Sequence, residues 1–244
     1  MGLIESQAKR SPLTRSSQNT ELLRLEDVTK TYVTDGQSVH ALNGVSVTAH
    51  PGEFIALVGR SGCGKSTMLN LAGAMDFPTT GQVLLDGVST KDLNEMGLTR
   101  LRREKVGFIF QSFQLLNTLS VIENVELPLL LAGQTDTRES ARQQLELVEL
   151  ADLSSRMPHQ LSGGQMQRVA IARAMVHAPK LLLADEPTGN LDTITGNVIL
   201  KLLRRIADEH RTTILMATHS SESASFADAV VRMRDGRIEE IARS

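Results

Sequence analysis

A glycine-rich loop between an apolar run and an apolar, helix-like stretch constrains this chain more than any other feature. The run is Phe54 to Val58, and the loop after it matches the pattern G-x-x-x-x-G-K-[ST]. Such glycines let backbone N–H groups converge on a phosphate, and the following helix directs its positive end at the same point. Strand, loop and helix stand in the order that a phosphate-binding loop requires. The residues expected to hold the nucleotide are Gly59, Arg60, Ser61, Gly62, Cys63, Gly64, Lys65, Ser66 and Thr67.

A second glycine motif, LSGGQ, begins at Leu161. Its hydroxyl and its two unobstructed N–H groups stand at a predicted helix start, which makes a second anion site. One nucleotide does not need both sites. The plainer interpretation is an ordinary N-capped helix, because serine is a good cap residue. The residues of this second expected site are Ser162, Gly163, Gly164 and Gln165.

With these two motifs in this order, the chain resembles the nucleotide-binding subunits of ABC transporters over roughly residues 22–240. The further matching motifs are Tyr32, Gln111, the stretch from Leu181 to Glu186, the stretch from Asn190 to Asp192, and His219. The resemblance implies a head-to-tail homodimer in which the LSGGQ residues of one copy close over ATP held by the other. Within the family, Glu186 to Asp192 and Ser120 to Pro128 are similar to the branch of lipoprotein-releasing and macrolide-export ATPases.

The fold class expected is α/β, a P-loop NTPase with a RecA-like core, an N-terminal antiparallel β-subdomain and an inserted α-helical subdomain. Residues 1–21 are expected to be a disordered polar tail, and residues 22–244 the nucleotide-binding domain, with the helical subdomain at about 112–165.

Periodicity places the individual elements. Alternating apolar residues predict antiparallel strands, and the later alternation of strand and helix is typical of a parallel sheet. Predicted strands are Leu22 to Val28, Val45 to Phe54, Gln82 to Leu85, Val106 to Phe110, Lys180 to Asp185, Thr212 to Ala217 and Val230 to Arg234; predicted helices are Asp92 to Arg103, Arg138 to Leu150, Gly163 to Val176 and Thr195 to Ala207; turns are predicted at Asp35-Gly36 and Pro51-Gly52.

Chemistry assigns roles to the polar groups near the phosphates. Lys65 is expected to contact the β- and γ-phosphates, while Ser66 and Asp185 hold Mg²⁺. Strand alternation directs Glu186 away from Asp185 and toward the attacking water, so Glu186 is expected to be the general base. By resemblance, Gln111 senses the γ-phosphate or Mg²⁺, and His219 contacts the γ-phosphate and keeps the water in line.

Four further residues carry expectations, and two of them, Tyr32 and Cys63, also have a plainer alternative. Tyr32 is expected to stack on adenine, or else to be a strand tyrosine on a half-buried face. Asp192 belongs to the expected nucleotide site through its motif. Cys63 stands at a helix N-terminus, which favours a reactive thiol, or else it only fills space in the loop. Ser220 replaces the aspartate that commonly follows the histidine in this family, which puts in doubt how the histidine strand is braced across the dimer.

Composition limits the partners. The chain has 244 residues, 41% of them hydrophobic, a net charge of −2 and a pI near 6.3. This balance gives no basic footprint, so no nucleic acid is expected. The longest apolar stretches, such as Leu127 to Gly133, fall short of the roughly 20 residues that span a bilayer. A single cysteine and an N-terminus without an apolar signal region favour the cytoplasm.

The function expected is an ATPase subunit that uses ATP and Mg²⁺ to drive an integral membrane permease. The chain is then expected to be cytoplasmic and peripheral on the inner face of the cell membrane. The resemblance to the branch of lipoprotein-releasing and macrolide-export ATPases favours export or extraction of a lipoprotein, peptide or hydrophobic compound. The alternative is a mechanotransmitting or regulatory ATPase that acts on a membrane partner without transport. A translation or DNA-repair ATPase predicts twin cassettes or a coiled-coil insertion, and a nucleotide kinase has no use for LSGGQ.

Overall fold

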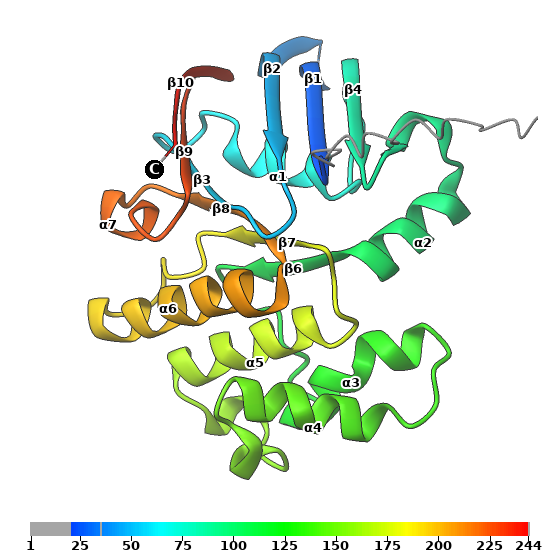
Figure 1. Ribbon diagram of the computed structural model, residues 1–244, viewed down its shortest axis with the longest axis vertical. Helices are drawn as coiled ribbons and strands as arrows, with labels where there is room; N and C mark the ends of the chain where they lie inside the picture. The colour runs from blue at the N-terminus through cyan, green and yellow to red at the C-terminus, as the bar shows by residue number, and fades with distance from the viewer. Residues whose placement is uncertain (1–20, 35, 244) are drawn as a thin grey trace, which may run out of the picture.

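Two β-sheets organise the computed structural model, which describes residues 21–34 and 36–243. The first is antiparallel, with strand order β2-β1-β4-β5, and it lies at the upper end of Figure 1. The second has the order β10-β9-β3-β8-β7-β6 and is parallel except for β10. The strands are β1 Leu23–Thr34, β2 Gln37–Ala49, β3 Phe54–Val58, β4 Thr80–Leu85, β5 Val88–Ser89, β6 Val106–Phe110, β7 Leu181–Asp185, β8 Thr213–Thr218, β9 Ala229–Arg234 and β10 Arg237–Arg243.

Helices cover both faces of the second sheet. Helix α1 contacts both this sheet and the antiparallel one, whereas α5, α6 and α7 pack on the opposite face. Helices α3 and α4 pack on α5 and form a helical lobe at the lower end of Figure 1. The helices are α1 Lys65–Ala72, α2 Glu95–Lys105, α3 Val121–Leu131, α4 Thr137–Leu147, α5 Gly163–Met175, α6 Thr193–His210 and α7 Ser221–Ala224, and the 3-10 turns are η1 Thr90–Asp92, η2 Ala151–Leu153 and η3 Pro158–Gln160.

The central strands divide their side chains between two hydrophobic cores. On β3, Phe54 and Ala56 enter the core shared with the helices, whereas Ile55 and Leu57 enter the core shared with α1 and the antiparallel sheet. Strands β7 and β8 alternate in the same way. Burial on both faces explains why these strands read as continuous apolar runs, which is typical of a parallel sheet covered by helices. Strands β3 and β7 are therefore held rigidly by packing on both faces up to their carboxyl ends.

The architecture confirms the expected fold class, with its parallel core, antiparallel β-subdomain and helical insertion. The predicted strand from Val45 to Phe54 is wrong only between Ala49 and Phe54, where β2 ends and β3 begins. The predicted turn at Pro51-Gly52 lies between them, and Gly52 adopts φ 80°. The predicted helix from Arg138 ends at Leu147, shortly before Glu149 takes φ 60°. The predicted tail lies outside the described residues apart from Glu21, as does Asp35, and the predicted domain boundaries stay predictions.

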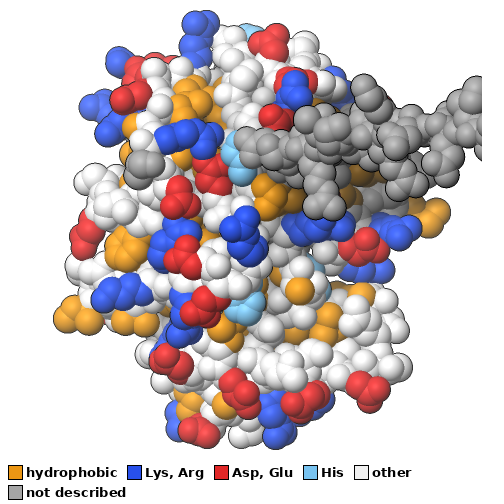
Figure 2. Space-filling model, viewed as in Figure 1, with side chains coloured by type: hydrophobic (Ala, Val, Ile, Leu, Met, Phe, Trp, Pro, Cys, Tyr) orange, Lys and Arg blue, Asp and Glu red, His pale blue; other side chains and the backbone are white. Residues whose placement is uncertain are grey.

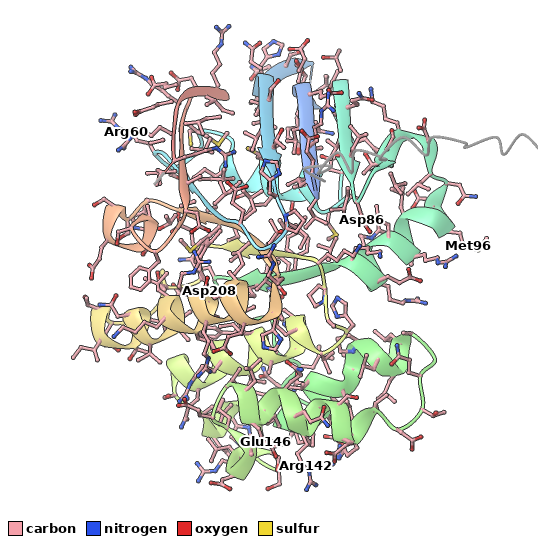
Figure 3. All side chains as sticks on the ribbon, viewed as in Figure 1. Arg60, Asp86, Met96, Arg142, Glu146 and Asp208 are labelled. Carbon is pink, nitrogen blue, oxygen red and sulfur yellow. The ribbon has the colours of Figure 1, made fainter. Side chains whose placement is uncertain are left out.

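The surface mixes both charges. Lysine and arginine side chains alternate with aspartate and glutamate over the face shown in Figure 2. The side of α4 that carries Arg142 and Glu146 faces away from the rest of the molecule (Figure 3). Among the described residues, no helix is both long enough and apolar enough to cross a bilayer.

Candidate functional site

The glycine-rich loop joins β3 to α1 and is shaped by close backbone contacts. Gly62 and Gly64 adopt φ 79° and 104°, in the region where a side chain is strained. A Cβ at Gly59 would lie only 2.3 Å from the carbonyl oxygen of Met233, and one at Gly64 only 2.5 Å from that of Ala41. The loop therefore fits between β2 and β9 only with glycine at these positions.

Lys65 is the first residue of α1, and its ammonium turns back onto the loop. Its Nζ donates to the carbonyl oxygens of Gly59, at 2.8 Å, and of Arg60, at 3.2 Å. Lys65 is buried, and the loop carbonyls hold its charge over the loop. This is where the ammonium must lie to meet a phosphate cradled by the same backbone.

A cleft of about 880 Å³ opens beside the loop. Its volume lies within the usual range for small-molecule sites. It brings together most of the residues predicted to act on the nucleotide, from four separate stretches of the chain, and a fifth stretch on β2 completes the lining. The residues lining it are Val39, His40, Ala41, Arg60, Ser61, Gly62, Gly64, Lys65, Ser66, Thr67, Phe110, Gln111, Ser112, Asp185, Glu186 and His219.

Asp185 and Glu186 follow each other at the end of β7, but strand alternation does not orient Glu186. The strand ends at Asp185, and Glu186 adopts φ 48°, in the left-handed region. Its backbone N–H donates to the carbonyl oxygen of Ala217 on β8, at 3.0 Å. The predicted reason for the orientation of Glu186 is therefore wrong, although both carboxylates do line the cleft.

His219 follows β8, and its Nδ1 lies 2.9 Å from Oε2 of Glu186. The imidazole is exposed, whereas the Glu186 side chain is mostly buried. The next residue, Ser220, accepts a hydrogen bond from the backbone N–H of Ser223 at 3.2 Å and so caps the short helix α7. Serine therefore serves this local cap, which an aspartate would also serve.

Gln111, directly after β6, pairs with a residue that the sequence did not single out for the site. Its Nε2 donates to Oδ1 of Asn190 at 3.2 Å, and Nδ2 of Asn190 donates to the carbonyl oxygen of Gln111 at 3.0 Å. A Cβ at Gly189 would lie 2.7 Å from Nε2 of Gln111. A side chain at position 189 would displace the Gln111 amide from this contact, so the segment after β7 holds Gln111 in place.

The LSGGQ residues form the start of α5. The Ser162 hydroxyl accepts from the backbone N–H of Gln165 at 3.3 Å, and the Gln165 side chain accepts from the backbone N–H of Ser162 at 2.9 Å. This is a capping box, as the plainer interpretation expects. A Cβ at Gly164 would lie 2.3 Å from Cγ2 of Thr195, so this motif packs on the start of α6. None of the described residues lining the cleft belongs to the motif.

Asp192 caps α6. Its carboxylate accepts from the backbone N–H of Thr195 at 3.0 Å and from the Thr195 hydroxyl at 2.6 Å. These hydrogen bonds from Thr195 lower the pKa of the Asp192 carboxyl, so it stays ionised. It lines a second hollow of about 290 Å³ that also contains Glu186 and His219.

Tyr32 lies on β1, where Asp76 and Lys30 fix its ring. The Tyr32 hydroxyl donates to Oδ2 of Asp76 at 2.8 Å, and Nζ of Lys30 lies 4.8 Å from the ring centroid. Burial, together with the hydrogen bond to Asp76, raises the pKa of the Tyr32 hydroxyl. Val39, opposite Tyr32 on β2, lines the cleft. The stacking role of Tyr32 stays a prediction.

Cys63 is buried in the loop. Its Sγ would lie 2.5 Å from a Cβ at Gly59. The thiol thus fills the space beneath the loop, as the plainer interpretation expects.

The oxygen donors predicted for Mg²⁺ are a hydroxyl, an amide and a carboxylate, on Ser66, Gln111 and Asp185, and all three line the cleft. Mg²⁺ prefers oxygen ligands and keeps several waters when it binds with a substrate phosphate. No group of three or more His, Cys, Asp or Glu side chains among the described residues is arranged to hold a metal. The donor set therefore fits an ion that phosphate and water complete.

Comparison with known proteins agrees with this geometry. The family model described as ABC transporter matches residues 42–189. The ABC transporter ATP-binding protein MJ0796 of Methanocaldococcus jannaschii is 43% identical over 224 residues, which cover 89% of this chain and 95% of that protein. Its dimeric post-hydrolysis structure, bound to ADP and Pi, superposes with a TM-score of 0.84 at 41% identity and covers 91% of this chain and 98% of that one.

Two further relatives match over most of this chain. The macrolide export ATP-binding/permease protein MacB of Chlorobaculum tepidum is 46% identical over 218 residues, which cover 88% of this chain but 33% of MacB. The structure of cbiO1 from Clostridium perfringens, part of the ABC transporter complex cbiONQ, has a TM-score of 0.84 at 31% identity and covers 92% of this chain and 89% of that one.

Proposed function

Because this chain belongs to the ABC transporter family as an ATP-binding ATPase subunit, we propose that it couples ATP-driven closure of a homodimer to a separate integral membrane permease. In the proposed dimer, ATP lies in the cleft of one copy, and Ser162 and the glycines after it complete the site from the other copy. One observation supports this arrangement most. The cleft is lined by Lys65 and most of the phosphate loop, whereas the LSGGQ residues start α5 outside it.

In the proposed reaction, the phosphate loop and Lys65 bind the β- and γ-phosphates. A water attacks the γ-phosphorus while the bond from this phosphorus to the β,γ-bridging oxygen breaks. ADP is the leaving group, and Glu186 accepts a proton from the water. Phosphoryl transfer has a loose transition state, so positioning and charge stabilisation account for most of the catalysis. The hydrogen bond from His219 supports this role, because it fixes the carboxylate at the edge of the cleft.

We propose that Ser66, Gln111 and Asp185 hold Mg²⁺, which supplies charge neutralisation for the phosphates when it is bound. Tyr32 would stack on the adenine, in the orientation that Asp76 and Lys30 set. Asp192 would lie at the dimer face, where its ionised carboxylate keeps the start of α6 ordered beside the partner.

The permease places the chain on the cytoplasmic, inner face of the cell membrane in this proposal. Similarity to MacB, a protein named for macrolide export, favours export or extraction of a lipoprotein, peptide or hydrophobic compound. The helical lobe would pass the movement to the permease. Its apolar side chains Leu116, Leu130 and Leu131 are exposed and offer a contact surface.

Two measurements test the proposal. Purified protein should hydrolyse ATP, and Lys65→Ala should remove both ATP binding and hydrolysis. A tagged chain, isolated from detergent-solubilised membranes, should bring down a polytopic permease. A partner that instead recruits cell-wall hydrolases would support the mechanotransmitting alternative. If the purified protein does not hydrolyse ATP, the proposal is rejected.

A further inference from the structure

Two consecutive residues soon after Gln111 adopt the left-handed backbone conformation. Phe113 has φ 60° and Gln114 has φ 52°. Residues other than glycine rarely adopt this conformation, and a bulky one such as phenylalanine does so at a cost. Such a pair persists only where the surrounding structure holds it. The role of the pair therefore depends on which residues hold it in this conformation.

Arg173 on α5 supplies these contacts. Its guanidinium donates through Nη1 to the carbonyl oxygen of Gln114 at 2.5 Å and through Nη2 to the carbonyl oxygen of Phe113 at 2.9 Å. Both of these acceptors are carbonyl oxygens and not carboxylates, and burial lowers the pKa of the Arg173 guanidinium. A charge-assisted pair of bonds to two carbonyls is thus the main compensation for this partly buried cation.

The bonds on either side show what Arg173 connects. Gln111 is bonded to Asn190, which lies in the segment between β7 and α6. Beyond Gln114, the fully buried Asn124 of α3 accepts from the backbone N–H of Leu116 at 2.8 Å and donates to its carbonyl oxygen at 3.0 Å. From Phe113 onward the segment is therefore bonded to α5 and α3. Its links back toward β6 are the hydrogen bonds from the backbone N–H of Phe113 to the carbonyl oxygen of Phe110 at 3.3 Å and from the backbone N–H of Gln114 to that of Ser112 at 2.6 Å.

Helix α5 carries Ser162 and Gly163 at its first turn and Arg173 three turns later. The Phe113 ring also reaches the first turn, since a Cβ at Gly163 would lie 3.8 Å from its Cζ. The strained pair thus touches α5 at both ends.

We propose that Arg173 is a positioning residue: it holds the strained pair Phe113–Gln114 in the left-handed conformation that keeps the Phe113 ring on the first turn of α5, so that a displacement of Gln111 by nucleotide reaches Ser162. Without Arg173, the pair relaxes to an ordinary backbone conformation, the ring leaves α5, and Gln111 moves without moving α5. The inference rests on the proposed function, because it assumes that Gln111 meets the nucleotide and that Ser162 acts on the partner's ATP.

The test uses Arg173→Met in the full chain, which keeps the length of the side chain and removes both donors. Binding of ATP to the isolated subunit should change less than about twofold, while kcat falls about tenfold or more. When Arg173→Met is combined with Glu186→Gln, the ATP-dependent dimer measured by light scattering should be weaker than in Glu186→Gln alone. The matched control is Arg205→Met, since Arg205 donates to one backbone carbonyl, that of Leu147 at 2.6 Å, away from this segment.

Rescue separates positioning from packing. Gln114→Gly removes the strain at one of the two positions, so Arg173→Met/Gln114→Gly should regain much of the lost kcat. If Arg173→Met does not fold, Arg173→Lys, which reaches one carbonyl, should show an intermediate kcat that Gln114→Gly also raises. A wild-type kcat in the Arg173 variants, or a loss that Gln114→Gly leaves unchanged, overturns the inference. The proposed function fails separately, if the wild-type chain neither hydrolyses ATP nor dimerises with it in the Glu186→Gln form.

Discussion

Nδ1 of His219 lies 2.9 Å from Oε2 of Glu186, and this contact joins the ends of two neighbouring parallel strands, β7 and β8. The carboxylate is mostly buried and the imidazole is exposed. Because the left-handed turn at Glu186 directs its side chain to this side of the sheet, the two groups stand at the same edge of the cleft. This arrangement suits a general base whose orientation a second group controls.

Glu186→Gln should reduce kcat by about 100-fold or more while ATP binding is retained, because the amide keeps the shape of the side chain but accepts no proton. Single-turnover hydrolysis and equilibrium ATP binding measure the two effects. Glu149→Gln is the matched control, since Glu149 has a similar left-handed φ of 60° but an exposed side chain outside the cleft. Undiminished steady-state hydrolysis in Glu186→Gln would reject Glu186 as the base.

Mixing two inactive variants tests the composite site. Ser162→Arg replaces the capping residue of α5 by a bulky cation, and Lys65→Ala removes the ammonium of the phosphate loop. A heterodimer of the two retains one interface with both wild-type halves, so an equal mixture should recover up to roughly a quarter of the wild-type rate. Native mass spectrometry confirms that heterodimers form. If heterodimers form without any turnover, the shared site is wrong.

Gly236 supports the phosphate loop from the β9–β10 turn. Its N–H donates to the carbonyl oxygen of Cys63 at 3.1 Å, it has φ 75°, and a Cβ there would lie 2.9 Å from the Ala41 carbonyl oxygen. Gly236→Ala should therefore weaken ATP binding about tenfold by shifting the loop. Gly87→Ala carries a similar φ of 77° in open space and should destabilise the fold without this effect. Equal ATP affinities in the two variants, measured by calorimetry, would contradict this role.

Asp86, at the end of β4 (Figure 3), is bonded by Lys180 at 2.7 and 2.8 Å and lies 3.2 Å from Lys105. The hydrogen bonds from Lys180, with those from Lys105, lower the pKa of the Asp86 carboxyl below its ordinary 3.8. A lowered folded-state pKa stabilises the protein above pH 3.8, and this contribution is lost as the pH falls through the folded-state value.

Asp86→Asn should therefore cost about 1 kcal/mol at pH 7, and the cost should shrink below the ordinary pKa of the carboxyl. Asparagine also tolerates the left-handed φ of 52° at this position, so the backbone adds little to the difference. Urea unfolding at several pH values measures it. A difference that does not depend on pH would mean that the lysines contribute nothing through charge.

The core of the fold was predictable because its strands are buried on both faces and its helices are amphipathic. The apolar runs that became β3, β6, β7 and β8 stand close to their predicted positions. Strand β10 was not predicted, because Arg237 to Arg243 carries mainly polar and exposed side chains and pairs antiparallel at the sheet edge. The position of β10 depends on β9 and on the turn at Gly236, so no local sequence pattern predicts it.

The candidate site divides in the same way. The loop from Gly59 to Thr67 was recognisable, because its glycines, lysine and serine stand at a fixed short-range spacing, although the backbone contacts that require glycine at positions 59 and 64 come from β9 and β2. Asn190 was recognised only as part of a motif, and neither its pairing with Gln111 nor the pairing of Arg173 with Phe113 was predicted. Each pair joins stretches about 60 to 80 residues apart in the chain, and only the packing of α5 and β7 on β6 brings them together.

The sequence by itself determined the order of strand, phosphate loop and helix, and the chemical groups available to a nucleotide, because these follow from residue type and short-range spacing. Tertiary structure alone decided where those groups point. Glu186 reaches the cleft through a left-handed turn bonded to β8 and not through strand alternation, because long-range hydrogen bonds and packing can fix a backbone conformation that local preference disfavours.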